Sequence, residues 1–446
     1  MTRLFLLFFI LFYQNLFGQK LLKKDLIQDL TYLNEAVING HPVNYDPNIK
    51  VNILSVIERA EQLKTDSISP TDYSLWIERG IYTIGCVHTS IKKKSTFTNK
   101  DSIAFIPLTA SVYEEKLLIT SCIDSTKVGQ YITTINGKII NDIIEPFKEY
   151  KASDGGTNAF AKEYFHLASS KLISTTLQHA KIYAVKTIES EFSLSGTNAP
   201  FKRLQTKNSQ NILMSNNTNQ FYTIDNFAIL KVNTFQKSDK HFFDNFFKKI
   251  RKLKTEKLLI DLRQNLGGNR ATSIMLTKYL VDTTFAYSIL QPKLRTKKYL
   301  NRKGKYYLFL SKLKYNVGNM FKKHESEYGN EFTYSYKPKK QNHFDGKLYV
   351  ITDGFTASAS TMVTSWLKQH TNAIFIGNQA GGGYNGNNGG SFPIITLPKS
   401  KIEITFPAYR LILDKKSENR TGILPDIYVQ SNTDVSEIIK LIQKNK

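Results

Sequence analysis

The chain has 446 residues, which is enough for two or three domains with a sizeable core. Hydrophobic residues make up 41% and charged residues 22%, with 28 Phe and 24 Tyr, so the composition is globular and argues against disorder. The formal net charge of +24 would suit a polyanionic partner. Most of the lysines are scattered, however, and no nucleic-acid-binding module is recognisable, so we expect no nucleic-acid partner.

The first 18 residues have the pattern of a secretory signal peptide. Arg3 precedes an apolar segment at 4–12 that is too short to cross a bilayer, and cleavage after Gly18 is plausible. No later segment has enough uninterrupted apolar residues for a membrane span. We therefore expect an exported protein of a bacterial-type envelope, periplasmic or secreted. Cys86 and Cys122 then form one disulfide or remain buried thiols.

Residues 19–98 have the periodicity of helices. Apolar residues recur at helical spacing from Leu26 onward, and Ser69 followed by Pro70 is typical of a helix start. Residues 99–155 change to short strand-like runs, and Asn136-Gly137 between two of them predicts a hairpin. The sequence thus predicts an N-terminal helical region followed by a small β module.

Residues 156–446 contain two strand–turn–helix units, which predict an α/β core with parallel strands. The first has a strand at 257–261 and a glycine-containing turn, and the second has a strand at 347–352. Between them, residues 285–345 form a basic, aromatic insertion long enough for a flap or a binding surface. The glycine-rich run at 381–390 lacks the features of a nucleotide-binding loop, and we expect a mobile loop near a cleft.

The second unit places Ser358 at or just before a helix N-terminus. Unpaired backbone N–H groups at such a place stabilise developing negative charge, which a nucleophilic serine requires. The alternative is that Ser358 or Ser360 only caps the helix.

Three motifs follow one another along the α/β core: D-L-R-Q-N-L-G-G at 261–268, T-A-S-A-S at 356–360 and G-I-L-P-D at 422–426. In order and spacing they resemble the S41 serine peptidases, which include the C-terminal processing (tail-specific) proteases and their tricorn-like relatives. The resemblance implies a crotonase/ClpP-like peptidase core, and it suggests that the β module at 99–155 is PDZ-like.

The resemblance also implies roles for individual residues. It places the nucleophile at Ser358 and the oxyanion hole at the backbone N–H groups of Ala359 and Gly268. Processing proteases of the family use a Lys as general base downstream of the serine. No Lys occurs between Lys368 and Lys399 in this chain, so a Ser–Lys dyad is not expected.

The tricorn-like branch instead uses a His from the N-terminal region and a Glu late in the core, and His88 and Glu418 lie at corresponding places. A neutral imidazole is the usual base for a serine. The preceding residue is Val87, where that branch has a Ser linking the His to the Glu. His41 is the rival base, with helix capping as its other role, and Cys86 is a weaker candidate nucleophile without an accompanying oxyanion turn.

From these residues we expect an exported serine endopeptidase that hydrolyses peptide bonds in proteins or peptides through an acyl-enzyme on Ser358. We expect no cofactor, and no cluster of His, Cys and carboxylates has metal-ligand spacing in the sequence. The alternative is a non-catalytic peptide-binding or scaffold protein with the same fold.

Overall fold

The computed structural model describes residues 21–45, 51–93, 104–113, 116–202, 211–292, 296–318 and 323–444. The predicted signal peptide at 1–18 lies outside these residues. Among them, no helix is both long and apolar enough to cross a membrane. Cys86 and Cys122 are buried free thiols in two separate hydrophobic cores, so the disulfide alternative is wrong.

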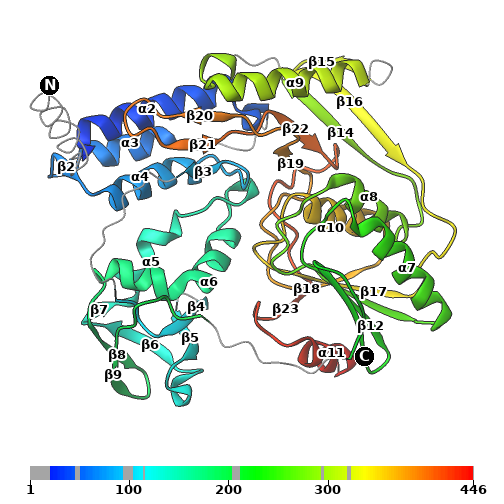
Figure 1. Ribbon diagram of the computed structural model, residues 1–446, viewed down its shortest axis with the longest axis horizontal. Helices are drawn as coiled ribbons and strands as arrows, with labels where there is room; N and C mark the ends of the chain where they lie inside the picture. The colour runs from blue at the N-terminus through cyan, green and yellow to red at the C-terminus, as the bar shows by residue number, and fades with distance from the viewer. Residues whose placement is uncertain are drawn as a thin grey trace, which may run out of the picture.

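The N-terminal region is helical, as its periodicity predicts (Figure 1). Ser69 accepts the N–H of Asp72 at the start of the third helix, 3.1 Å away. The helices share one hydrophobic core with the α/β layers. Its elements are β1 (Leu21–Leu22), α2 (Lys23–Gly40), η1 (Pro42–Tyr45), α3 (Ile53–Glu61), β2 (Ser67–Ile68), α4 (Pro70–Tyr82) and β3 (Ser90–Lys93).

The β module is an antiparallel sheet in the order β4-β5-β6-β8-β9, with β7 paired to β6 across the turn at Asn136 and Gly137. Both turn residues have positive φ, as the hairpin prediction requires. The predicted end of the module at 155 is too early, because β8 and β9 complete the sheet. Its elements are β4 (Leu108–Tyr113), β5 (Lys116–Cys122), η2 (Ser125–Lys127), β6 (Tyr131–Ile135), β7 (Lys138–Ile139), α5 (Ile140–Lys148), η3 (Asp154–Gly156), α6 (Ala159–Thr176), β8 (Ile182–Thr187) and β9 (Glu191–Ser195).

The α/β core is built on a seven-stranded sheet in the order β10-β11-β12-β13-β17-β18-β23. The five strands from β12 to β23 are parallel, as predicted, with Ile260 of β13 opposite Val350 of β17. The strands are β10 (Ile212–Ser215), β11 (Asn219–Ile224), β12 (Phe227–Val232), β13 (Lys257–Asp261), β17 (Lys347–Thr352), β18 (Ile374–Gly377) and β23 (Ile427–Tyr428).

Helices cover both faces of this sheet (Figure 1). Alternate strand residues such as Leu230 and Ile260 pack into the core with α7 (Asp239–Lys252), α8 (Arg270–Lys278) and α10 (Ala359–His370). Their neighbours in the strands, such as Ile229 and Leu259, pack against α11 (Val435–Lys444) on the opposite face. This burial on both faces explains the continuous apolar runs in β12, β13 and β17.

The described residues of the insertion at 285–345 form helices and strands that join the fold. Its elements are β14 (Phe285–Pro292), η4 (Thr296–Lys298), α9 (Arg302–Gly318), β15 (Lys323–Ser326) and β16 (Gly329–Tyr336). The strands join a second sheet in the order β15-β16-β14-β22-β19, with β22 (Tyr409–Ile412) and β19 (Gly386–Gly389). A third sheet, β20-β21-β3, pairs β20 (Ile394–Thr396) and β21 (Glu403–Thr405) with the N-terminal β3.

The glycine-rich run at 381–390 is mostly buried, and part of it forms β19. The expected mobile loop is therefore wrong. Its glycines permit close packing: a Cβ on Gly382 would collide with Oγ1 of Thr361.

Candidate active site

The two predicted turns meet at one edge of the sheet, because β13 and β17 are adjacent and parallel. Asp353, which follows β17, accepts the N–H of Gln264 in the first turn at 2.9 Å. The N–H of Ala357 donates to the carbonyl of Asn265 at 3.2 Å. Ligand sites of open parallel sheets form at the carboxyl ends of the strands, and these bonds fix both turns there.

Ser358 occupies the N-cap position of α10 in a conformation that non-glycine residues rarely adopt, with φ 57° and ψ −119°. Its side chain makes no capping hydrogen bond, and within the described residues its hydroxyl has no hydrogen-bond partner. It is partly exposed, whereas the residues on either side are buried. Ser360 is buried and donates to the carbonyl of Asn265 at 2.9 Å. Neither serine caps the helix, and of the two only Ser358 presents a free hydroxyl.

Two backbone N–H groups lie beside Ser358. Ala359 is the first residue of α10, so its N–H has no partner within the helix. A Cβ built on Gly267 would lie 2.7 Å from the nitrogen of Ala359, which shows how closely the Gly267 turn approaches it. The N–H of Gly267 itself is occupied, because it donates to Oδ1 of Asn265 at 2.9 Å.

Gly268 supplies the other N–H group of this turn. It lies opposite Phe235 in a parallel bridge. The N–H of Phe235 donates to the carbonyl of Gly267, and the N–H of Asn269 donates to the carbonyl of Phe235, so the bridge uses no group of Gly268 itself. The N–H of Gly268 is therefore directed away from Phe235, and within the described residues it makes no hydrogen bond to the backbone.

His88 lies in the loop between α4 and β3. Its ring stacks on Phe392 with a centroid separation of 5.3 Å, and its Nδ1 is buried without a hydrogen-bond partner in the part of the chain that is described. Burial lowers the pKa of His88 to about 4, because a charged imidazole loses hydration there. His88 is therefore neutral at pH 7, the state in which an imidazole can accept a proton.

His41, the rival base, is fully buried at the end of α2. Its Nδ1 accepts the N–H of Val43 at 3.0 Å, which leaves the proton on Nε2, and Nε2 then donates to Oγ1 of Thr89 at 2.8 Å. Burial, with Arg410 and His88 nearby, lowers the pKa of His41 to about 3. Both ring nitrogens are thus used, and His41 supports the loop that carries His88.

Asp154 links the His88 loop to the serine turn. Its Oδ1 accepts the N–H of Val87 at 3.0 Å, and its Oδ2 accepts the N–H of Gly383 at 3.1 Å. The adjacent N–H of Gly382 donates to the carbonyl of Thr356, 3.1 Å away in the serine turn. Burial raises the pKa of the Asp154 carboxyl to about 6, against the two N–H donors and Arg410, which lower it.

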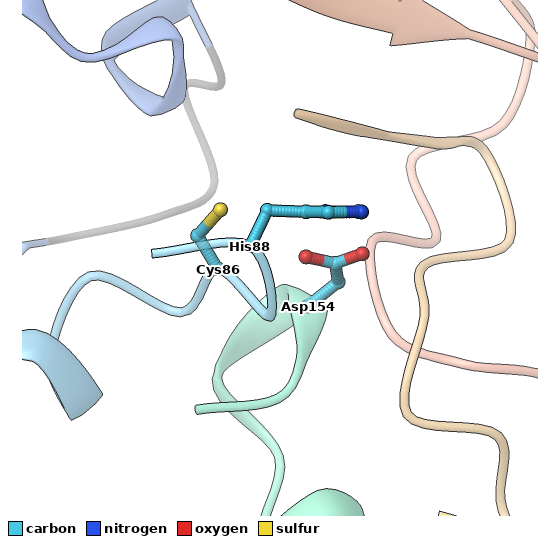
Figure 2. A group of neighbouring side chains, drawn as sticks. All are labelled: Cys86, His88 and Asp154. Carbon is cyan, nitrogen blue, oxygen red and sulfur yellow. The ribbon is translucent and has the colours of Figure 1, made fainter. Parts of the chain in front are cut away.

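Figure 2 shows the Asp154 carboxylate directed toward the His88 ring, with Cys86 in the same loop as His88. One ligand atom from each of these residues lies within 4.8 Å of the others, a cluster that sequence spacing did not reveal. Burial raises the pKa of Cys86 to about 11, so the thiol keeps its proton at neutral pH. It therefore lacks the thiolate that a nucleophile needs.

Glu418 is exposed in the loop after β22 and does not belong to this cluster. The loop is nevertheless close to the site, because Asn419 accepts the N–H of Asn385 at 3.2 Å through its carbonyl. Asp261 and Arg263 form a bidentate ion pair of 2.9 and 2.7 Å that fixes the start of the first turn, which fits a structural pair.

The strand–turn–helix serine, the backbone N–H groups beside it and a neutral, partly buried imidazole are groups of the kind that an acyl-transfer hydrolase uses. A family model for peptidase family S41 matches residues 226–429, a segment that contains all five parallel strands from β12 to β23. No curated protein sequence matches the chain.

Solved structures of one protein, CPAF, resemble nearly the whole chain in fold. Mature CPAF complexed with lactacystin has 12% identity and a TM-score of 0.63, and the match covers 95% of this chain and 98% of that one. A CPAF mutant has 13% identity and a TM-score of 0.62, with 91% and 93% covered. The photosystem II D1 C-terminal processing protease has 13% identity and a TM-score of 0.41, with 94% and 96% covered.

Proposed function

We propose that the chain is an exported serine endopeptidase that hydrolyses peptide bonds through an acyl-enzyme on Ser358. The match of residues 226–429 to peptidase family S41 supports a peptidase with protein or peptide substrates. The observation that carries the serine mechanism is Ser358 itself: a partly exposed, uncapped hydroxyl with a positive φ at a helix N-terminus. Strained non-glycine residues of this kind cluster at functional sites, and nucleophilic serines occupy such sharp strand-to-helix turns.

In the proposed mechanism Oγ of Ser358 attacks the scissile carbonyl while His88 removes its proton. The N–H groups of Ala359 and Gly268 bind the oxyanion of the tetrahedral intermediate. His88 then gives the proton to the leaving amine, and water releases the acyl group by the same steps in reverse.

We assign the support of His88 to Asp154 as a positioning residue. The Asp154 carboxylate lies in the cluster with His88 and holds the preceding residue, Val87, through its N–H. Glu418 is the other candidate carboxylate for supporting His88. It is exposed, and only the position of its loop favours it. The two carboxylates can be separated by substitution.

Labelling with a fluorophosphonate probe tests the proposal. The mature protein should be labelled on Ser358, as located by mass spectrometry, and should degrade an unfolded protein such as casein. Ser358→Ala should lose both signals, whereas Ser360→Ala keeps the labelled residue. A folded protein that is not labelled and does not cleave casein but binds unfolded chains would support the non-catalytic scaffold instead.

A further inference from the structure

The helix α9 is anchored on one face only. Gly304, Leu308, Ser311 and Tyr315 recur at i, i+4, i+7 and i+11 and face the protein: Leu308 and Tyr315 are buried, and Ser311 shares a 2.9 Å hydrogen bond with Tyr409. Tyr315 also packs edge-to-face on Tyr409. This face holds the helix in place without using the rest of its surface.

The opposite face of α9 is apolar and exposed. Tyr306, Leu310, Leu313 and Val317 follow the same i, i+4, i+7, i+11 spacing, displaced by two residues, which is about 200° around a helix. Their side chains are 40–71% exposed, and Phe309 at the edge of this stripe is 61% exposed. A helix of a soluble protein normally presents polar residues there.

Positive charge borders this apolar stripe on both sides. At 100° per residue, Lys305 and Lys312 lie on one flank, and Lys303 and Lys314 lie on the other. In the described part of the chain, none of these four lysines forms an ion pair. The sequence contains no Asp or Glu from 283 through 324, so no carboxylate close in sequence offsets this charge.

We propose that α9 is a membrane-surface helix that docks the protein on a bilayer containing anionic phospholipids. An apolar stripe with aromatic residues between two rows of lysine is suited to the boundary of headgroups and acyl chains, where the lysine stems lie along the apolar region and the ammonium groups reach the phosphates. Figure 1 shows α9 along an outer edge of the molecule. Pairing of two α9 helices would instead bring rows of lysine together.

Sedimentation with large vesicles tests this proposal on the full mature protein. We expect binding to vesicles of equal parts phosphatidylglycerol and phosphatidylcholine, at least about tenfold weaker binding to pure phosphatidylcholine, and release by added salt. Leu310→Gln/Leu313→Gln should lose the binding. The matched control is Ile182→Gln/Ile188→Gln, which removes two exposed isoleucines of the β module, 62% and 67% exposed, and should bind as the parent does.

A second measurement reports on the helix directly. In Phe309→Trp, the emission of the introduced tryptophan should shift to shorter wavelength when anionic vesicles are added. Brominated acyl chains should quench this emission. Absence of binding, or binding unaffected by Leu310→Gln/Leu313→Gln, overturns the proposal. Concentration-dependent dimers that disappear in the same variant would assign the stripe to self-association, and exclusive capture by an acidic protein would assign it to a protein partner.

Discussion

Gly267 lies directly against Ser358: a Cβ added to Gly267 would be 2.7 Å from the Cβ of Ser358 and 2.7 Å from the backbone nitrogen of Ala359. Real Cβ atoms do not approach other atoms this closely, so the absence of a side chain at 267 is what permits the first turn to reach the nucleophile. The backbone at Gly267 also has φ +101°, which disfavours any other residue.

We therefore expect Gly267→Ala to displace Ser358 and Ala359 and to lower casein hydrolysis by about 10²-fold or more, since a shift of about 1 Å at reacting groups has such effects. Fluorophosphonate labelling should fall in parallel. The matched control is Gly129→Ala, where φ is +91° but nothing lies within 4 Å of the added Cβ. Gly129→Ala carries similar backbone strain and should keep the activity of the parent. Equal activity in Gly267→Ala and Gly129→Ala would show that the close approach of Gly267 to Ser358 does not matter for catalysis.

The position of this turn follows from local sequence. A strand, a glycine turn and a helix are visible in residues 257–280, and parallel pairing of β13 with β17 then places the turn beside Ser358. Short-range patterns of this kind depend on neighbouring residues and can be recognised in a single sequence. The same holds for the hairpin at Asn136 and Gly137.

Other parts of the site depend on contacts between distant residues. Asp154 lies at the end of the segment that we predicted as the β module, and its partners Val87 and Gly383 are 67 and 229 residues away. A Ser-Asp-Gly-Gly run marks a turn at 153–156, but nothing in it indicates what the carboxylate binds. The expectation of a mobile loop at 381–390 fails for a similar reason, because glycine permits both exposed loops and close packing.

Substitution of the two candidate carboxylates should give unequal results. Asp154→Asn places an amide NH₂ against the N–H of either Val87 or Gly383, so it removes one hydrogen bond and loosens the His88 loop. We expect kcat to fall by about 10-fold to 10²-fold with a smaller change in KM, which is the pattern for a group that positions the base.

Glu418→Gln is the matched comparison, because Glu418 is exposed and lies outside the cluster with His88. Its kcat should stay within about twofold of the parent, as is usual for an exposed surface residue. The reverse order, with Glu418→Gln inactive and Asp154→Asn active, would return the supporting role to Glu418.

The pH dependence of Ser358 labelling should report on His88. A base acts only in its neutral form, and burial lowers the pKa of His88 to about 4. Labelling should therefore be fast at neutral pH and should decline as the pH falls through about 4, well below the ordinary histidine value of about 6.5. The measurement is the labelling rate against pH, confined to conditions where circular dichroism shows the folded protein.

Two substitutions control this profile. His88→Gln should abolish rapid labelling at every pH, whereas His241→Gln, at an exposed position on α7, should leave the profile unchanged. A midpoint near 6.5, or an unaltered profile in His88→Gln, would remove His88 as the base.

Two serine hydroxyls of α6 form hydrogen bonds with the backbone at the outer edge of the β module. We expect these bonds to keep an extended peptide from pairing with that edge. β4 is the outer strand of its sheet, where an extended peptide would add as a further strand. The N–H groups of Ile106 and Ala110 instead donate to Oγ of Ser174 and Ser169, 2.8 and 2.9 Å away. Two N–H groups at this edge, one in β4 and one just before it, are thus already bonded, and we expect them to prevent extended peptides from adding at β4.

Ser174→Ala tests this closure. It leaves the buried N–H of Ile106 without its acceptor, and a buried unsatisfied donor costs about 1–3 kcal/mol. Urea unfolding should show a loss of that size. Thr175→Ala is the control one residue along the same helix, because its hydroxyl bonds to the carbonyl of Lys171 at an exposed position, and it should change stability by less than about 0.5 kcal/mol.

Fluorescence polarisation with labelled extended peptides should detect no binding to the protein when it carries only the Ser358→Ala substitution. Saturable binding that is lost on substitution of residues in β4 would show that a peptide replaces the serine hydroxyls at this edge. The module would then be a substrate-docking site rather than a closed structural unit.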